Sequence, residues 1–387
     1  MTLPLHSGNP PKYLTRRMTK LAGCISKVII DEYGTLEFLK KLSDPLWFQA
    51  FGCVLGFDWH SSGLTTVVMA VLKQSINVDS HGIAIAGGKG RNAIRTPHEI
   101  YDICNREFNL SDIKIKALLY ASKMSAKVDN SAIQDYYHLY HHNIIFDSWG
   151  NWSIVQQGIN ANNNTSRRYH WLSKWLSESF VIEPHTGMLG ESNYGNNVLN
   201  MTSKTSIENQ KTSIDILNDH QNIKDLYSSV CRLLTHRKDM TIDSWIDLPM
   251  VKSNMFTLTT SDSKELNLHY SMPSKIDWNL IRYIHEIQPS NYEEFLSVTG
   301  VGPSTVRAIS LIAELIFGSK TSWKDPIKFT FAHGGKDGVP HFIDRKTYDE
   351  SIKFLQCSIE GAEISRQDRD QSLKKLAEYN QKLFCHG

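Results

Sequence analysis

Apolar residues recur at helical spacing along the first part of the chain. Between residues 11 and 43 they fall three or four positions apart, which places them on one face and predicts helices. Residues 44–58 are dense in large aromatic and aliphatic side chains and predict a core segment. A further helix is predicted over residues 64–76.

After residue 82 the runs of apolar residues are shorter. Ile83–Ala86 predicts a short strand that leads into a glycine-rich turn at residues 87–90. Thr96, followed by Glu99 three positions later, then predicts the start of a helix through a capping box.

The hydrophobic pattern in the middle of the chain first predicts strands and then helices. Residues 138–159 are typical of a β-hairpin that turns near residues 147–151, and a polar loop is predicted at residues 160–166. From about 186 to 240, Ser, Asn and Lys are frequent and apolar positions are sparse, which predicts a helical connector. The charged tail at residues 345–384 is predicted to be mainly helical.

A tight glycine motif joins two predicted helices near the C-terminus. The first follows Asn291 as its N-cap, and the second runs from Pro303 to a stop at Gly318. Between them, Gly300 and Gly302 let a ligand approach the main chain. Amides without partners at the start of the second helix attract anions, so a backbone phosphate is expected there.

This motif resembles the helix-hairpin-helix module, which grips nucleic-acid phosphate without reading sequence. The resemblance covers about residues 291–318, and lysines that follow it can pair with further phosphates while Trp323 stacks on a base. The alternatives are an ordinary corner between two helices and a solvated surface. The residues expected to contact phosphate are Gly300, Gly302, Ser304, Thr305, Lys320 and Lys324.

Together these elements predict an α+β protein. Residues 1–185 are expected to form an α+β domain that carries the chemistry, with a β-hairpin in it. A helical connector is expected at residues 186–270, and a helical nucleic-acid-binding domain at residues 271–387. The length of 387 residues suits two or three domains.

Composition narrows the class of protein. With 42 Lys and Arg against 40 Asp and Glu, contact with nucleic acid must come from local patches. The six cysteines form no Cys-x-x-Cys pair, which predicts reduced thiols in a cytoplasmic protein and excludes a cysteine zinc site. No leader pattern and no apolar stretch of about 18 residues is found, so neither secretion nor a membrane partner is expected.

Two polar clusters in the first hundred residues suggest chemistry. Asp58 and His60 stand two positions apart before a predicted helix, so they can form a metal pair or an acid/base pair. Ser61 or Asp58 can instead cap that helix. In the turn at residues 86–91, Lys89 can act in catalysis and Arg91 can hold phosphate, although no P-loop pattern is present.

A third cluster contains Asp135, His138 and His142. The spacing of four residues keeps His138 and His142 on one face in either a helix or a strand. Two imidazoles with a carboxylate can bind a divalent metal or act in general acid/base catalysis. In the hairpin, His142 is expected opposite Gln156 or Gln157. The alternative is an aromatic-rich sheet face with hydrogen-bonded histidines.

Two further clusters favour phosphate contacts. Arg167 and Arg168 precede aromatic residues, and this combination suits clamping of phosphate and stacking of bases. The glycine-rich stretch at residues 331–340 can present polar groups to a ligand, or it can be a simple connection. The residues expected to contact nucleic acid here are Gln157, Arg167, Arg168, Tyr169 and Lys336.

Several of these motifs together resemble a prokaryotic family catalogued as domain of unknown function 763. The resemblance covers nearly the whole chain and implies a cytosolic protein, more often archaeal, but it implies no activity. The segments that carry it are Leu3–Gly8, Phe48–Gly52, Phe57–Gly63, Ala86–Gly90, Leu139–His142, Val155–Gly158, Arg167–Trp171 and Phe331–Gly338.

The polar N-terminal half and the phosphate-binding motif together predict a DNA-processing or repair enzyme. It would cleave a phosphodiester or N-glycosidic bond as a nuclease or a glycosylase/lyase, with a divalent metal as a candidate cofactor. Two alternatives remain, a non-catalytic nucleic-acid-binding adaptor and an enzyme that processes RNA or nucleotides. Asp325 lies near the position of the catalytic aspartate in helix-hairpin-helix glycosylases, but the sequence around it predicts a structural turn.

Overall fold

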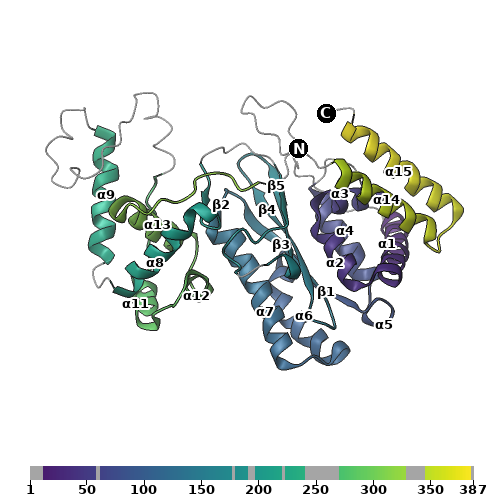
Figure 1. Ribbon diagram of the computed structural model, residues 1–387, viewed down its shortest axis with the longest axis horizontal. Coiled ribbons are helices and arrows are strands. Elements are labelled where there is room, and N and C mark those ends of the chain that lie inside the picture. Colours follow the sequence, from purple (N-terminus) through teal and green to yellow (C-terminus); the bar gives the residue numbers. More distant parts are fainter. Residues whose placement is uncertain are drawn as a thin grey trace.

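The computed structural model describes residues 12–57, 62–176, 179–190, 197–219, 223–239, 270–327 and 345–384. An antiparallel sheet of five strands, in the order β1-β3-β4-β5-β6, lies at the centre of an α+β fold (Figure 1). Its strands are β1 (Ile83–Lys89), β3 (His138–Asp147), β4 (Trp152–Asn160), β5 (Thr165–Leu172) and β6 (Gly187–Leu189). A second sheet pairs β2 (Ile133–Gln134) with β7 (Leu199–Asn200).

One face of the central sheet packs against helices from both ends of the chain. Alternation along the strands points Ile85, Ile145 and Val155 into this layer, where they join one hydrophobic cluster. The helices of the layer are α1 (Lys12–Tyr33), α2 (Thr35–Ser43), α3 (Pro45–Val54), α4 (Gly63–Ser75), α14 (Arg345–Gly361) and α15 (Arg366–Phe384). The short helix α5 (Val78–His81) leads into β1.

The opposite face packs against the remaining helices. Ile144, Ile154 and Trp171 point into this second layer, and its hydrophobic cluster continues through α8 to α13. Figure 1 shows these helices on the left of the view, beyond the sheet from α1 to α4. The α-helices of the layer are α6 (Arg91–Ile103), α7 (Asp112–Lys127), α8 (Ile207–Asp219), α9 (Ile223–Asp239), α11 (Trp278–Ile287), α12 (Tyr292–Ser297) and α13 (Pro303–Phe317). Short π-helical turns follow α6 and α7, at Cys104–Phe108 and Val128–Ala132.

Many of the predicted elements are present. The first helical stretch divides at Gly34, whose φ of +87° suits glycine and separates α1 from α2. The hairpin of β3 and β4 turns at residues 148–151, as predicted. Asn291 caps α12, and α13 begins at Pro303 and ends before Gly318, also as predicted.

Two local predictions near β1 were wrong. The glycines expected in a turn are part of the strand, because β1 pairs with β3 as far as Lys89. The next helix begins at Arg91, so Thr96 lies inside α6 and donates its hydroxyl to the carbonyl of Ala93. Glu99 accepts a hydrogen bond from the Gly87 amide instead of closing a capping box.

The long-range arrangement differs from the expected division of the chain. The segment predicted as a helical connector contributes β6 to the central sheet, so this unit extends past residue 185. The C-terminal helices α14 and α15 pack against α1 and α3, and not against α13 (Figure 1). Among the described residues, no helix is both long and apolar enough to cross a membrane.

Candidate functional site

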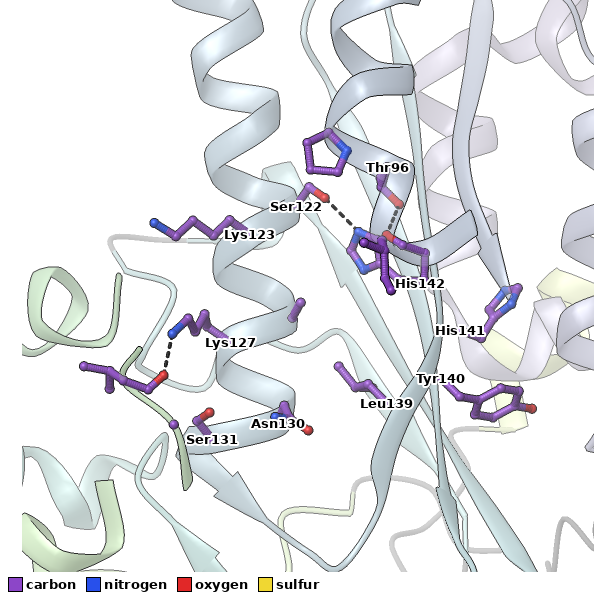
Figure 2. Close-up of a pocket in the computed structure, with 16 residues that line it drawn as sticks. Thr96, Ser122, Lys123, Lys127, Asn130, Ser131, Leu139, Tyr140, His141 and His142 are labelled. Carbon is purple, nitrogen blue, oxygen red and sulfur yellow. Dashed lines mark hydrogen bonds between the residues drawn. The ribbon is translucent and has the colours of Figure 1, made fainter. Parts of the chain in front are cut away.

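A pocket of about 460 Å³ lies where α6, α7 and β3 meet the loop before α13. Figure 2 shows His142 on β3 facing Ser122 on α7, while Lys123 and Lys127 extend from the same helix. Gly302, the N-cap residue of α13, also lines this pocket. The pocket therefore joins the central sheet to the glycine motif.

A chain of hydrogen bonds leads from the pocket into the core. The Ser122 Oγ and His142 Nε2 atoms are 2.8 Å apart, and His142 Nδ1 is 2.8 Å from Gln156 Oε1. Gln156 lies directly opposite His142 on β4 and donates from Nε2 to Asp129 at 2.6 Å. The four side chains form a relay that is buried except where Ser122 and His142 line the pocket.

Asp129 anchors this relay. It lies on the π-helical turn after α7 and is fully buried, yet its carboxylate accepts hydrogen bonds from three side chains. Besides Gln156, these are Trp171 Nε1 at 3.0 Å and His185 Nε2. Three donors satisfy a carboxylate that would otherwise be costly to bury, so its orientation is well determined.

The relay also determines the protonation of His142. Because the amide nitrogen of Gln156 faces Asp129, its oxygen faces His142 Nδ1, which must then carry the proton. Burial lowers the pKa of His142, although the bond to Gln156 and the charge of Asp129 partly oppose this. At pH 7 the ring is therefore neutral, with Nε2 free to accept the hydroxyl proton of Ser122.

The loop between α12 and α13, residues 298–302, carries Gly300 and Gly302 and is called the glycine loop. Side chains of α7 and β2 hold it in place. Lys127 Nζ donates to the carbonyls of Val298 and Val301, and Gln134 Nε2 donates to the Pro303 carbonyl at 2.9 Å. Burial lowers the pKa of Lys127, and neighbouring Lys123 lowers it further. The bond to the Val301 carbonyl holds this residue and the adjacent Gly302 where both line the pocket.

The glycine loop needs one of its two glycines for its conformation. Gly300 has a φ of +93°, and an added Cβ would lie 3.2 Å from Leu280. Gly302 has an extended backbone, and an added Cβ there would meet only the Gly300 carbonyl at 3.9 Å. Its lack of a side chain therefore leaves space at the pocket rather than relieving strain.

Three predicted site residues belong to a buried ion cluster instead. Arg167 pairs with Asp135 at 2.9 Å and with both carboxylate oxygens of Asp325, and Tyr169 donates to Asp135 at 2.7 Å. Burial disfavours the charge of Arg167, but the two carboxylates raise its pKa above the ordinary value. The cluster holds the segment after α13 against β5, and Asp325 is the structural residue that its sequence context indicated.

Other predicted residues share a row across the opposite face of the sheet. In this row Gln157 donates to the Ser62 carbonyl, and Arg168 donates to Gln49 while lying over the Phe48 ring. Burial, followed by the neighbouring His142, lowers the pKa of His141 to about 3. The row runs through Lys89, His141, Gln157 and Arg168, in that order across β1, β3, β4 and β5.

The expected pairing of His138 with His142 was wrong. A β-bulge between Leu139 and His141 places two residues of β3 opposite one of β4, and this reverses the alternation of side chains. His138 then lies on the exposed end of the strand, on the face opposite His142, while Asp135 is committed to Arg167. Within the described ranges, no three His, Cys, Asp or Glu side chains gather as metal ligands.

The remaining predicted residues are dispersed. Thr305 is buried in the first turn of α13. Asp58, His60 and Lys336 lie outside the residues that the structure describes. Besides His138 and Gly300, the exposed members of the predicted set are Lys89, Arg91, Ser304, Lys320 and Lys324.

Sequence reasoning did not identify Ser122 or the two lysines beside it. They lie on an amphipathic helix, and such serines and lysines occur on the surfaces of most helices. Only the pairing of α7 with β3 shows which of them reaches the histidine. Gln156 or Gln157 was expected opposite His142, and the register of β3 and β4 pairs His142 with Gln156.

Comparisons with known proteins identify the family but not its activity. No curated protein matches the chain, and no solved structure matches it either. A family model described as a protein of unknown function (DUF763) matches residues 1–343 of the 387. Since this match covers most of the sequence, the chain belongs to the DUF763 family.

Proposed function

We propose that this protein is a DNA-processing enzyme that holds the nucleic-acid backbone at the α13 N-terminus and acts on it beside His142. One observation carries this proposal: Gly302 of the glycine motif and His142 line the same pocket. The two features are 160 residues apart in the sequence, and each was predicted separately to serve nucleic-acid chemistry. Because both line one pocket, a single bound phosphodiester could contact the N-terminus of α13 and His142 together.

The charge of the pocket supports a phosphate ligand. The first amides of α13 point outward from a helix N-terminus, which carries a partial positive charge. Lys123 and Lys127 add cationic groups on the neighbouring wall, and Lys123 is exposed. This set of donors and cations suits a phosphodiester and does not depend on base sequence.

The chemistry assigned to this pocket is narrower than the sequence alone suggested. Asp135, Arg167 and Tyr169 are fully engaged with one another in the core, and Arg168 is buried on the other face. His142 is the predicted catalytic residue that combines a pocket position with a defined tautomer. We therefore assign general acid/base catalysis of backbone cleavage to His142.

Binding can be tested by measuring the affinity for end-labelled single-stranded and duplex DNA over a range of salt concentrations. Wild-type protein is expected to bind with an affinity that falls steeply as salt rises. Gly302→Val should weaken binding at least tenfold, because the new side chain would fill space at the pocket. The backbone of Gly302 is extended and the added Cβ would have room, so the substitution should not strain the loop. Lys123→Ala should also weaken binding and make the salt dependence shallower.

Lys40→Ala is the matched control, since Lys40 is an exposed lysine on α2, which packs in the layer on the other face of the sheet. It should bind like wild type. Equal affinities for all four proteins, or an affinity that does not change with salt, would contradict the proposed backbone site.

Two alternatives have distinct outcomes in the same assays. A non-catalytic adaptor would show salt-sensitive binding that depends on Gly302, but would leave every substrate intact. An RNA-processing enzyme would bind an RNA strand more tightly than the DNA strand of the same sequence, because only RNA offers a 2′-hydroxyl.

A further inference from the structure

Ser122 presents a hydroxyl on the pocket wall to an imidazole that a buried carboxylate orients. We infer that Ser122 is a nucleophile for phosphoryl transfer, and that His142 is the base that takes its proton. This inference rests on the proposed function, because it concerns the same pocket and takes the phosphodiester as its substrate. It adds a catalytic residue and selects backbone cleavage over N-glycosidic cleavage.

The geometry is that of an activated hydroxyl. A serine is a weak nucleophile unless a base lies within hydrogen-bond reach, and Ser122 Oγ is 2.8 Å from His142 Nε2. The base needs a third group to orient it, and Gln156 does this from the opposite strand. Asp129 in turn fixes Gln156 at 2.6 Å, so the base is oriented from the core outward.

The relay ends at the pocket and not in the core, which distinguishes it from an ordinary buried network. Ser122 is 5% exposed and His142 is 6% exposed, whereas Gln156 and Asp129 are fully buried. Thr96 lines the same pocket, but it donates its hydroxyl to the Ala93 carbonyl of its own helix. The hydroxyl of Ser122 is therefore paired with a base, and that of Thr96 with a backbone oxygen.

The reaction can be written with all atoms in balance. Ser122 Oγ forms a bond to phosphorus as its proton moves to His142 Nε2, and the bond from phosphorus to the leaving sugar oxygen breaks. The imidazolium then gives the proton to that oxygen. The intermediate is a phosphodiester between Ser122 Oγ and the remaining strand. In the second step water attacks its phosphorus while His142 takes the proton of the water, the bond from phosphorus to Ser122 Oγ breaks, and the imidazolium gives that proton to Oγ to restore the hydroxyl.

The test uses the full-length protein and a fluorophosphonate probe, which requires no nucleic acid. A nucleophilic serine attacks its phosphorus and releases fluoride, and intact-mass and peptide mass spectrometry then locate the adduct. Wild-type protein should acquire one adduct, on Ser122. Ser122→Ala should acquire none, and His142→Gln should react at least a hundredfold more slowly.

The matched control is Ser125→Ala, which makes the same change one turn further along α7. Ser125 is buried and donates only to the Ser122 carbonyl, at 3.2 Å, so labelling should stay near the wild-type rate. Circular dichroism and thermal unfolding identify any variant that fails to fold. If Ser122→Ala does not fold, the labelling position in wild type and the rate for His142→Gln decide the matter.

The outcomes separate this inference from the proposed function. Labelling on Ser122 without salt-sensitive nucleic-acid binding would leave the nucleophile standing and remove the nucleic-acid substrate. Salt-sensitive binding with no labelling of folded wild-type protein, or with labelling that is unchanged in Ser122→Ala, would overturn the nucleophile alone.

Discussion

At the scale of single residues, Arg167 shows how one sequence pattern fits two roles. An arginine pair beside aromatic residues suits a phosphate clamp, but Arg167 is completely buried and holds two carboxylates. Its neighbour Arg168 points to the opposite face of the sheet, where it pairs with Gln49. Adjacent strand residues face opposite ways, so the two arginines cannot grip one phosphate together.

The ion cluster gives a direct stability prediction. Arg167→Met should lower the free energy of unfolding by about 3–5 kcal/mol, because it leaves Asp135 and Asp325 buried without their cation. Urea unfolding followed by fluorescence measures this loss. Arg91→Met makes the same change at an exposed position and should cost less than about 0.5 kcal/mol. A loss in Arg167→Met no larger than in Arg91→Met would show that the cluster is not structural.

At the scale of secondary-structure elements, the bulge in β3 and the packing of α13 both depend on residues that are distant in the sequence. The bulge places His138 and His142 on opposite faces of the sheet, although four positions separate them, and His142 is the one that faces Ser122. On α13, Glu314 is largely buried and accepts a hydrogen bond from Trp323 Nε1 at 3.2 Å. This contact ties the end of α13 to the segment that carries Asp325.

Glu314 predicts a pH dependence of stability. Burial raises the pKa of Glu314 to about 7, although its hydrogen bond to Trp323 partly opposes this. Because the pKa of Glu314 is higher in the folded protein than in the unfolded chain, its contribution to the free energy of unfolding is complete below the ordinary carboxyl pKa. This contribution is lost as the pH rises through 7. Glu314→Gln keeps an acceptor for Trp323 without the charge. It should therefore match wild type at pH 4.5 and exceed its unfolding free energy by about 1–2 kcal/mol at pH 8.

Urea unfolding at the two pH values measures this difference. Glu208→Gln, at an exposed position on α8, should show no such change with pH. A Glu314→Gln variant that gains nothing between pH 4.5 and pH 8 would show that Glu314 does not titrate near neutrality.

At the scale of the whole molecule, local signals were sufficient for many of the helices and for the hairpin of β3 and β4, but not for α7 or β5. Helical spacing, the Asn291 cap and the Gly318 stop predicted helices that are present, and the α+β class followed from them. Long-range packing was not predictable in the same way. Nothing in residues 345–384 indicates that α14 and α15 pack against α1 and α3, because many surfaces can accept an amphipathic helix.

The candidate site was predictable only in part for the same reason. His142 and Gly302 were recognised as candidates, each from its own sequence context. Ser122, Lys123 and Lys127 became candidates only through the packing of α7 between β3 and the glycine loop. A site assembled from three separate elements depends on their tertiary arrangement, which residue spacing within one segment does not encode.

We propose that the pocket shared by His142 and Gly302 cleaves a nucleic-acid backbone. The most direct measurement incubates wild type, His142→Gln, Gly302→Val and Lys40→Ala with end-labelled single-stranded, duplex and abasic DNA, with magnesium, manganese or chelator. The products are resolved on a denaturing gel with and without alkali. We predict strand cleavage without alkali by wild type and Lys40→Ala. Cleavage by His142→Gln should be at least a hundredfold slower, and cleavage by Gly302→Val at low DNA concentration should be at least tenfold slower, in line with its weaker binding. Intact DNA in every wild-type reaction, or equal cleavage by all four proteins, would show that this pocket does not cleave DNA.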